Sequence, residues 1–297
     1  MLSLIKKFVK SLPYLRTIIQ ERDQLRLEVA NLQQQQSKFN SIEKSAAPLL
    51  QKDLPVFENY GYCSCCVSTV RFVAYGSWWR DQYLCKKCGS IPRERALMYC
   101  IDSFFPAWRN LTIHESSPSN RAASLRLKNE CPAYIGTQYY PDVPSGTIYN
   151  DFRCENLESL SFQNDSIDLH ITQDVFEHIF NPDKAFTEIA RTLKPGGAHI
   201  FTVPIVNKNN PTEVCARMAT DGKVENFREP EYHGNPISED GSLVTTRWGY
   251  DICDFIFKCS GLFTKVVILN VLDLGIRAEY IDVFITEKPL SLQKRIE

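Results

Sequence analysis

The clearest hydrophobic pattern covers residues 167–204 and predicts a strand, a helix and a second strand. Apolar and polar side chains alternate over residues 167–171, as in a strand that delivers Asp174 to its carboxyl end. Asn181 is a good N-cap residue followed by a proline, so a helix begins there, and an apolar run over residues 199–203 predicts the next strand. Strand, crossover helix and strand indicate a parallel sheet, whose ligands bind at the carboxyl ends of the strands.

Shorter hydrophobic runs on both sides extend this unit into an α/β domain. The predicted strands cover residues 111–114, 133–137, 264–269 and 280–285, and the predicted helices cover residues 121–128 and 251–259. The last two strands have the pattern of an antiparallel, hairpin-like pair at the edge of a sheet. We therefore expect a Rossmann-like α/β fold over residues 106–297, with a mostly parallel sheet whose last strand is antiparallel.

The first segment, residues 1–45, carries a heptad pattern. Its apolar core positions are Leu15, Ile18, Leu25, Val29 and Leu32, and Arg22 occupies one further core position. About three heptads can form a short coiled coil, which predicts a homodimer through this helix. The alternative is a single amphipathic helix that lies on its own domain or makes peripheral contact with a membrane surface. Residues 46–59 have the composition of a linker.

A cysteine pattern marks residues 60–105, which we call the cysteine segment. Two C-x2-C pairs have the spacing of a structural zinc site, and they consist of Cys63, Cys66, Cys85 and Cys88. Four thiolates predict a closed, tetrahedral Zn²⁺ site, because no position is left for water or substrate. Cys65 is an extra thiol that could replace a ligand of the first pair, and reduced cysteines without a metal are the alternative.

Composition and charge narrow the class of protein. Of the 297 residues, 43% are hydrophobic and 23% are charged, as in soluble globular proteins. The net charge of −1 argues against nucleic acid as a partner, because a long nucleic-acid track needs a strongly basic face. We find no secretory signal and no uncharged run long enough to span a bilayer, so the eleven cysteines indicate a reducing, cytoplasmic compartment.

The stretch from residue 167 to 204 resembles the strand-four-to-strand-five segment of class I S-adenosylmethionine-dependent methyltransferases, in particular the type-11 branch. The matching motifs are D-V-F-E-H at residues 174–178, E-I-A-R at residues 188–191 and L-K-P-G-G at residues 193–197. The resemblance extends more loosely over residues 110–285. It implies S-adenosylmethionine as the cofactor and methyl transfer as the activity.

The resemblance also implies where the methyl donor binds. Glu115 would end the first strand of the domain, and the donor would contact the loop that follows, at Ser116 and Ser117. The family has a glycine-rich turn here, because glycine permits unusual dihedral angles and close backbone approach. This chain has no glycine in the loop, which is built from serines, a proline and an asparagine.

Four further positions complete the implied donor site. Gln138 stands where the family has an acid for the ribose, and its side-chain carbonyl can accept one hydrogen bond. Glu155 and Asn156 fall where the family contacts adenine, and Asp174 faces the crevice between donor and acceptor. The alternative for each of these polar residues is a solvated position in a loop.

Two histidines are the candidates for a catalytic base. Histidine titrates near neutral pH, so His178 or His233 could accept a proton from a hydroxyl acceptor. His233 lies in the long insertion after residue 204, where such enzymes build the acceptor pocket. The alternatives are a structural role for His178 and a loop position without catalytic duty for His233.

The leading hypothesis is a methyltransferase that acts on a small molecule or a glycan. One alternative is a non-catalytic, methyltransferase-like interaction protein whose glycine-free loop no longer binds the donor. Another is a nucleic-acid-directed methyltransferase whose cysteine segment contacts RNA or DNA. The residues that would make such contacts are Trp78, Trp79, Lys86, Lys87, Arg93 and Arg95.

Overall fold

The computed structural model describes residues 21–22, 24–26, 28–29, 32, 54–235 and 240–290. The chain divides into two units, Met1–Leu54 and Pro55–Glu297. The described residues of the first unit are helical, except Leu54, and Leu25, Val29 and Leu32 are more than half exposed. The apolar heptad positions Leu15 and Ile18 lie outside the described residues, so the coiled coil and the homodimer stay predictions. None of the described helices has the length and apolar character needed to span a bilayer.

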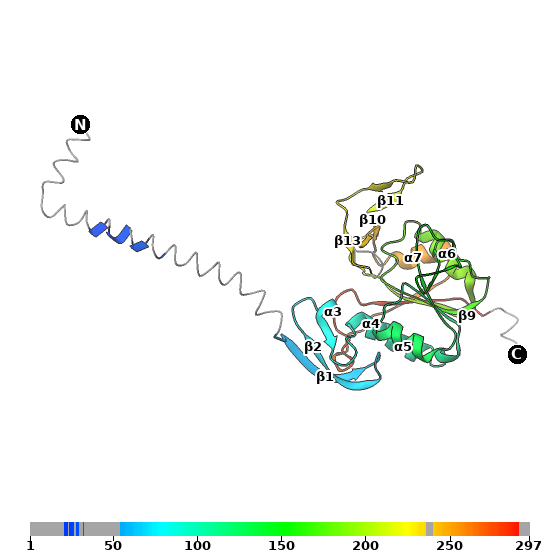
Figure 1. Ribbon diagram of the computed structural model, residues 1–297, viewed down its shortest axis with the longest axis horizontal. Coiled ribbons are helices and arrows are strands. Elements are labelled where there is room, and N and C mark those ends of the chain that lie inside the picture. The colour runs from blue at the N-terminus through cyan, green and yellow to red at the C-terminus, as the bar shows by residue number, and fades with distance from the viewer. Residues whose placement is uncertain are drawn as a thin grey trace. The chain divides into compact units, whose positions relative to one another are not determined.

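The second unit is built on an eight-stranded sheet (Figure 1). In spatial order its strands are β16 (Thr264–Val267), β17 (Val283–Glu287), β9 (Leu193–Thr202), β8 (Ile167–Gln173), β4 (Ile113–Ser116), β5 (Tyr134–Gln138), β7 (Phe152–Cys154) and β6 (Ile148–Tyr149). Neighbouring strands run parallel from β9 to β7, whereas β17 is antiparallel to both β9 and β16. The predicted fold, a Rossmann-like sheet that is mostly parallel with an antiparallel last strand, is confirmed.

Helices cover both faces of this sheet. They are α4 (Pro92–Phe104), α5 (Ala122–Glu130), α6 (Pro182–Thr192) and α7 (Ile252–Ser260), whereas the short helix α3 (Trp79–Gln82) contacts α4. Ile200 and Ile285 pack into one apolar core with residues of α4 and α5, whereas Phe201 and Phe284 pack into a second core with residues of α6 and α7. Successive residues of β9 and β17 thus face opposite helical layers, because strand side chains alternate with a period of two.

Helix α6 ends at Thr192 and β9 begins at the next residue. The proline and glycines at residues 195–197 are typical of a turn, but here they lie within the strand. Residues 194–197 form the first part of β9, and Gly196, with a φ of 84°, donates its N–H to Lys288 O at 2.8 Å. A Cβ atom on Gly197 would lie 2.7 Å from Asp168 O. The second glycine of the motif is therefore needed because β9 and β8 approach closely there.

The cysteine segment contains a small antiparallel sheet. Its strands are β1 (Phe57–Cys63), β2 (Ser68–Ala74) and β3 (Tyr83–Cys85), so β1 begins inside the predicted linker. This sheet shares the first apolar core with the main sheet. Arg95 of α4 is fully buried and donates hydrogen bonds to Tyr83 O at 2.9 Å and to Gly275 O at 2.7 Å. Shared packing and buried hydrogen bonds therefore join the cysteine segment to the later domain.

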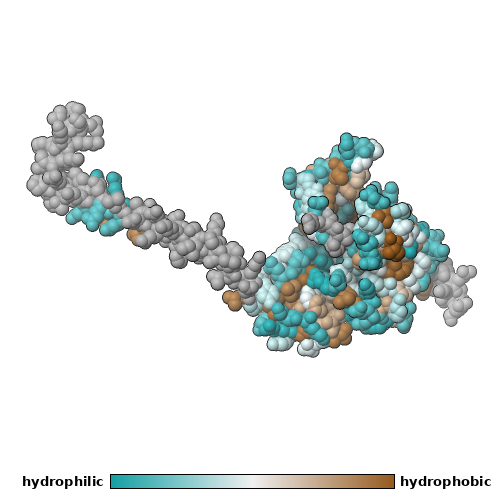
Figure 2. Space-filling model, in the orientation of Figure 1, coloured by the Kyte–Doolittle hydropathy of each residue, from teal (hydrophilic) through white to brown (hydrophobic). Residues whose placement is uncertain are grey.

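The insertion after β9 consists of short antiparallel pairs. They are β10 (Glu213–Val214) with β15 (Thr246–Arg247), β11 (Ala216–Met218) with β12 (Val224–Asn226), and β13 (Tyr232–His233) with β14 (Ser242–Leu243). The backbone N–H of Thr245 donates to Glu177 O at 2.7 Å, which ties the insertion to the loop after β8. On the face shown in Figure 2, hydrophilic and hydrophobic residues lie side by side over this insertion.

Candidate active site

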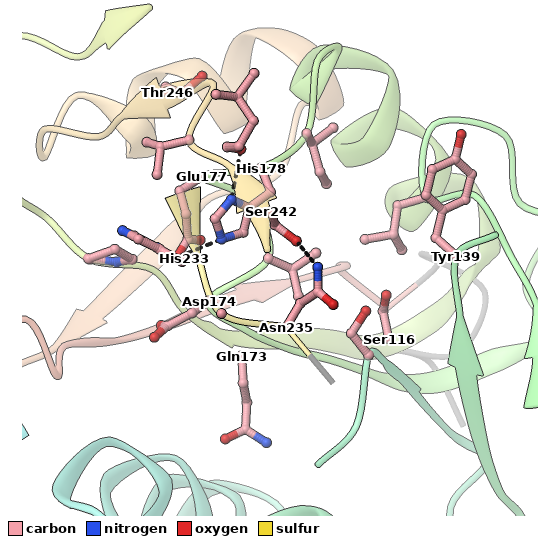
Figure 3. Close-up of a pocket in the computed structure, with 18 of the residues that line it drawn as sticks. Ser116, Tyr139, Gln173, Asp174, Glu177, His178, His233, Asn235, Ser242 and Thr246 are labelled. Carbon is pink, nitrogen blue, oxygen red and sulfur yellow. Dashed lines mark hydrogen bonds and ion pairs between the residues drawn. The ribbon is translucent and has the colours of Figure 1, made fainter. Parts of the chain in front are cut away.

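A cavity of about 1170 Å³ opens between the carboxyl ends of β4, β5 and β8 and the insertion (Figure 3). The predicted donor and catalytic residues that line it are Ser116, Ser117, Gln138, Glu155, Asn156, Asp174, His178 and His233. They come from segments far apart in the sequence, which the parallel sheet brings to one edge. Among the described residues, Glu115 is the predicted site residue that is not part of the lining.

Glu115 lies behind the cavity wall in a buried hydrogen-bond network. Its carboxylate accepts hydrogen bonds from Ser124 Oγ, Tyr134 Oη and Gln173 Nε2 at 2.7–2.8 Å. Burial raises the pKa of this carboxyl group, and the three donors offset part of that effect. The network connects the end of β4 to α5, β5 and β8. The geometry therefore supports a positioning role for Glu115 in place of direct contact with the donor.

The loop after β4 adopts a conformation that usually requires glycine. Ser117 has a φ of 54°, in the left-handed region, and its N–H donates to Thr137 O at 2.8 Å. Pro118 packs against Gly136 of β5, where an added Cβ atom would lie 3.2 Å from Pro118 Cγ. The loop itself has no glycine, but Gly136 on the neighbouring strand leaves space for the ring of Pro118.

The next part of the wall comes from the ends of β5 and β7. Gln138 is buried, and its backbone carbonyl accepts the N–H of Glu155 at 3.0 Å. The Glu155 carboxylate accepts hydrogen bonds from Arg153 Nε at 2.8 Å and from Ser161 N at 2.9 Å. Asn156 Oδ1 accepts the N–H of Glu158 at 2.9 Å. These polar groups are held by the protein itself, so this edge is preorganised.

Asp174 is held by two arginines that the sequence analysis did not connect to it. Arg80 of α3 forms an ion pair and a hydrogen bond with its carboxylate. Arg93 of α4 places Nε 3.0 Å from Oδ2, an ion pair whose geometry falls short of a hydrogen bond, and Thr202 Oγ1 donates at 3.0 Å. Burial alone would raise the pKa of Asp174, but Arg93 and Arg80 outweigh it and hold the pKa at about 2.

These contacts change the interpretation of the cysteine segment. Arg93 pairs with Asp174, and the Arg95 side chain is buried, so neither guanidinium is presented to a nucleic acid. Trp79 stacks on Phe57 with ring centroids 4.8 Å apart. The segment therefore contributes a wall of the cavity, which Arg80 and Arg93 line.

Three residues at the opposite side of the cavity form a compact group (Figure 3). They are Glu177, His178 and His233, and one ligand atom from each lies within 4.8 Å of the others. The two imidazole rings are 5.2 Å apart and perpendicular. Burial lowers the pKa of His178. Both predicted histidines are thus brought together, whereas Glu177 escaped the sequence analysis because nothing local marks it as buried.

The four predicted cysteine ligands also come together. Their Sγ atoms lie within 4.8 Å of one another, with Cys63 and Cys88 3.8 Å apart and Cys66 and Cys85 3.9 Å apart. A tetrahedral ion with Zn–S bonds of about 2.3 Å needs sulfur atoms about 3.8 Å apart, so this donor set fits zinc. Cys65 is not part of the group.

One known protein family matches part of this chain. The family model described as a methyltransferase domain matches residues 134–201, which run from β5 into β9. The match covers this part of the chain alone, and it supports the predicted enzyme class, a methyltransferase that uses S-adenosylmethionine. Comparison with the curated proteins gives no match.

Solved structures similar to this methyltransferase share little sequence with it. An S-adenosylmethionine-dependent methyltransferase from Mesorhizobium loti is 12% identical over 65% of this chain and 97% of its own, with a TM-score of 0.42. One from Methanosarcina mazei is 15% identical over 64% and 98%, with a TM-score of 0.38. The Burkholderia thailandensis 1,6-didemethyltoxoflavin-N1-methyltransferase, solved with its substrate and S-adenosylhomocysteine, is 9% identical over 66% and 78%, with a TM-score of 0.40. Because these TM-scores are low, the solved structures do not strengthen the evidence from the family match.

Proposed function

We propose that the methyltransferase transfers a methyl group to a small molecule or a glycan held in the cavity described above. The observation that carries the proposal is one cavity that joins the donor edge to the imidazoles of His178 and His233. Its volume of about 1170 Å³ is above the range of about 300–1,000 Å³ for pockets that hold one drug-sized ligand. The cavity therefore has room for a donor and an acceptor together.

The donor would lie across the ends of β4, β5 and β7. The Ser116–Ser117 backbone would meet its amino-acid part, Gln138 its ribose, and Glu155 with Asn156 its adenine. The residues are compatible with this assignment because they line one continuous edge of the cavity. Glu115 would keep the loop in place through its network, and the charge of Asp174 would be shared with Arg80 and Arg93.

The bound donor supplies a methyl group on a positively charged sulfur, which keeps the electron pair when the methyl carbon leaves. The protein has to hold the acceptor in line with that bond, because positioning provides much of the rate acceleration in a displacement. A hydroxyl acceptor would lie beside His178 and His233, where its proton leaves. At this end of the cavity Glu177 is buried and His178 is mostly buried, whereas His233 is 42% exposed.

We also propose that Cys63, Cys66, Cys85 and Cys88 hold one structural Zn²⁺ ion. The sulfur spacing supports this, and a closed set of four thiolates leaves no position for a substrate. The ion would stabilise the cysteine segment, whose helices α3 and α4 carry Arg80 and Arg93. Elemental analysis of protein purified without chelators should then find one zinc per chain, and a value near zero would contradict the assignment.

Donor binding can be tested by calorimetry and by thermal unfolding with S-adenosylhomocysteine. The product should raise the melting temperature, because a ligand that binds only the folded state stabilises it. Gln138→Ala should weaken binding about five-fold, since one neutral hydrogen bond contributes about 1 kcal/mol. The matched control is Gln163→Ala, at an exposed turn. If neither donor nor product binds the wild-type protein, the non-catalytic interaction protein becomes the better hypothesis.

The homodimer remains a proposal for the first unit. Leu25, Val29 and Leu32 are exposed and recur at helical spacing, so they offer an apolar stripe to a second chain. Light scattering should show a dimer for the full chain and a monomer for a chain that starts at Lys52, with unchanged donor affinity. If both chains scatter as monomers at high concentration, vesicle flotation would test the membrane-surface alternative.

A further inference from the structure

Glu177 is a buried carboxylate without a partner. Its side chain is 2% exposed, and among the described residues neither oxygen has a hydrogen-bond partner. The nearest basic atom is His178 Nε2, 3.8 Å from Oε1, which is too long for a hydrogen bond. Unpaired buried charges are strongly unfavourable, and the usual remedies are a paired cation, a metal ion or a proton. Among the described residues, no positively charged group therefore lies within hydrogen-bond distance of the Glu177 carboxyl oxygens.

The adjacent imidazole is oriented as a ligand would be. Nδ1 of His178 donates to the carbonyl oxygen of Leu243 at 2.9 Å, which leaves the lone pair on Nε2. A metal-bound histidine commonly has this arrangement, with the remote nitrogen fixed by a backbone carbonyl. His233 lies on strand β13 of the insertion, and its side chain is 42% exposed. Its Nε2 atom lies 3.3 Å from Oε1 of Glu231. Its ring can therefore turn towards the cavity without breaking a strong buried contact.

We propose that Glu177, His178 and His233 bind a divalent transition-metal ion. All three ligand atoms lie within 4.8 Å of one another, so sub-ångström to ångström shifts would bring them to coordination distances of about 2.0–2.2 Å. Two imidazoles and one carboxylate suit Zn²⁺, Fe²⁺ or Ni²⁺ better than Mg²⁺ or Ca²⁺, which prefer oxygen ligands alone. This site is separate from the cysteine site, which has four sulfur ligands and no open position.

Three protein ligands leave coordination positions open towards the cavity. All three residues line it, and Figure 3 shows them grouped away from Ser116 and Tyr139 on the donor side. An acceptor hydroxyl bound at an open position loses its proton more easily, because a divalent ion lowers the pKa of an oxygen it binds. The proton then leaves to solvent, and the alkoxide oxygen forms the new bond to the methyl carbon. This role, but not the binding of the ion, rests on the proposed methyl transfer.

Cobalt titration of the full-length protein would test the binding step. Co²⁺ in a four-thiolate site gives an intense thiolate charge-transfer band, whereas nitrogen and oxygen ligands give weaker visible bands alone. Protein that keeps zinc on its cysteines should take up one further equivalent of Co²⁺ and show only the weaker bands. Glu177→Gln and His233→Ala should each weaken this uptake at least ten-fold. Glu158→Gln, a charge-removing change elsewhere in the same cavity, is the matched control and should bind normally.

Melting temperatures check that the variants are folded and give a second readout. Without added metal, Glu177→Gln should melt at or above the wild-type temperature, because it removes an unpaired buried charge. With added Zn²⁺, the wild type should gain stability and the variant should gain much less. If the wild type takes up no further ion, or if all variants take it up equally, the metal site is wrong. Donor binding without uptake of the further ion would reject the metal site alone and leave the proposed function standing.

Discussion

Asp174 and Glu177 lie three residues apart after β8, and their surroundings differ completely. Both side chains are largely buried and both line the cavity. Asp174 is balanced by Arg80 and Arg93, which hold its pKa at about 2. Glu177 has no hydrogen-bond partner among the described residues, and burial, reinforced by Asp174, raises its pKa far above the ordinary value. The Asp174 carboxylate is therefore balanced by arginines of the chain, whereas the Glu177 carboxyl group is left to a proton or to the metal ion proposed above.

The difference shows how the two sides of the cavity are made. The Asp174 side joins the cysteine segment to the sheet through long-range ion pairs, so it is rigid before any ligand arrives. The Glu177 side is built from a loop and an insertion of short antiparallel pairs, and among the described residues the Glu177 carboxyl group has no hydrogen-bond partner. Rigid, satisfied groups suit the binding of a donor whose shape is constant, whereas an unsatisfied group indicates a ligand that contributes charge.

The largest expected effect follows from loss of the zinc ion, which we propose stabilises the segment that carries Arg80 and Arg93. Cys88→Ser should lose the zinc and destabilise β1–β3, because structural zinc contributes on the order of 10 kcal/mol in small domains. Asp174 would then resemble Glu177, a buried acid without firm partners, and donor affinity should fall at least ten-fold. Zinc analysis, circular dichroism and calorimetry would measure this. Cys65→Ser is the control, since Cys65 is not in the ligand group and should keep both zinc and donor binding.

The second effect compares the two acids directly. Asp174→Ala leaves two arginines facing each other without an acid, and breaking a buried ion pair typically costs about 3–5 kcal/mol. Glu177→Gln should instead raise the free energy of unfolding by about 1 kcal/mol without added metal, because folding no longer has to neutralise a buried acid. Denaturant unfolding of both variants would measure the two signs. Equal destabilisation by both changes would show that Glu177 has a cationic partner after all.

A smaller effect concerns pH. The pKa of Asp174 is lowered from 3.8 to about 2 in the folded protein. The wild type should therefore have its full advantage over Asp174→Asn above pH 3.8, and lose it as the pH falls through about 2. The expected advantage is about 2 kcal/mol, from 1.36 kcal/mol per unit of pKa. Unfolding curves at a series of pH values would measure it, and a difference that does not change with pH would contradict the ion-pair interpretation.

The smallest effect concerns the donor loop. Ser117 has a left-handed backbone, which β-branched residues avoid and glycine adopts freely. Ser117→Val should therefore weaken donor binding by about 1–2 kcal/mol, or five- to thirty-fold, because the loop must shift. Ser117→Gly should leave affinity within about two-fold of the wild type. Calorimetry would compare them, and a loss with glycine equal to that with valine would assign the effect to the serine hydroxyl.

Much of the fold could be predicted from sequence because its signals are local. Alternation along β8, the N-cap before α6 and the two C-x2-C pairs each depend on neighbouring residues alone, and each prediction has a counterpart in the structure. The resemblance to class I methyltransferases then implied most of the residues that line the cavity, with the exception of Glu115. That residue was assigned from its place at the end of a strand, but its side chain points into a network with Ser124, Tyr134 and Gln173.

The sequence by itself determined the element order, the sheet type and the four cysteines, since short-range spacing specifies periodicity and metal-ligand pairs. Only the tertiary structure decided that Arg80 and Arg93 balance Asp174, because these residues are far apart in the chain and meet only when α3 and α4 pack beside β8. It also decided that Glu177 has no hydrogen-bond partner among the described residues. Burial and pairing depend on everything that packs around a charge, and no local pattern of residues specifies that.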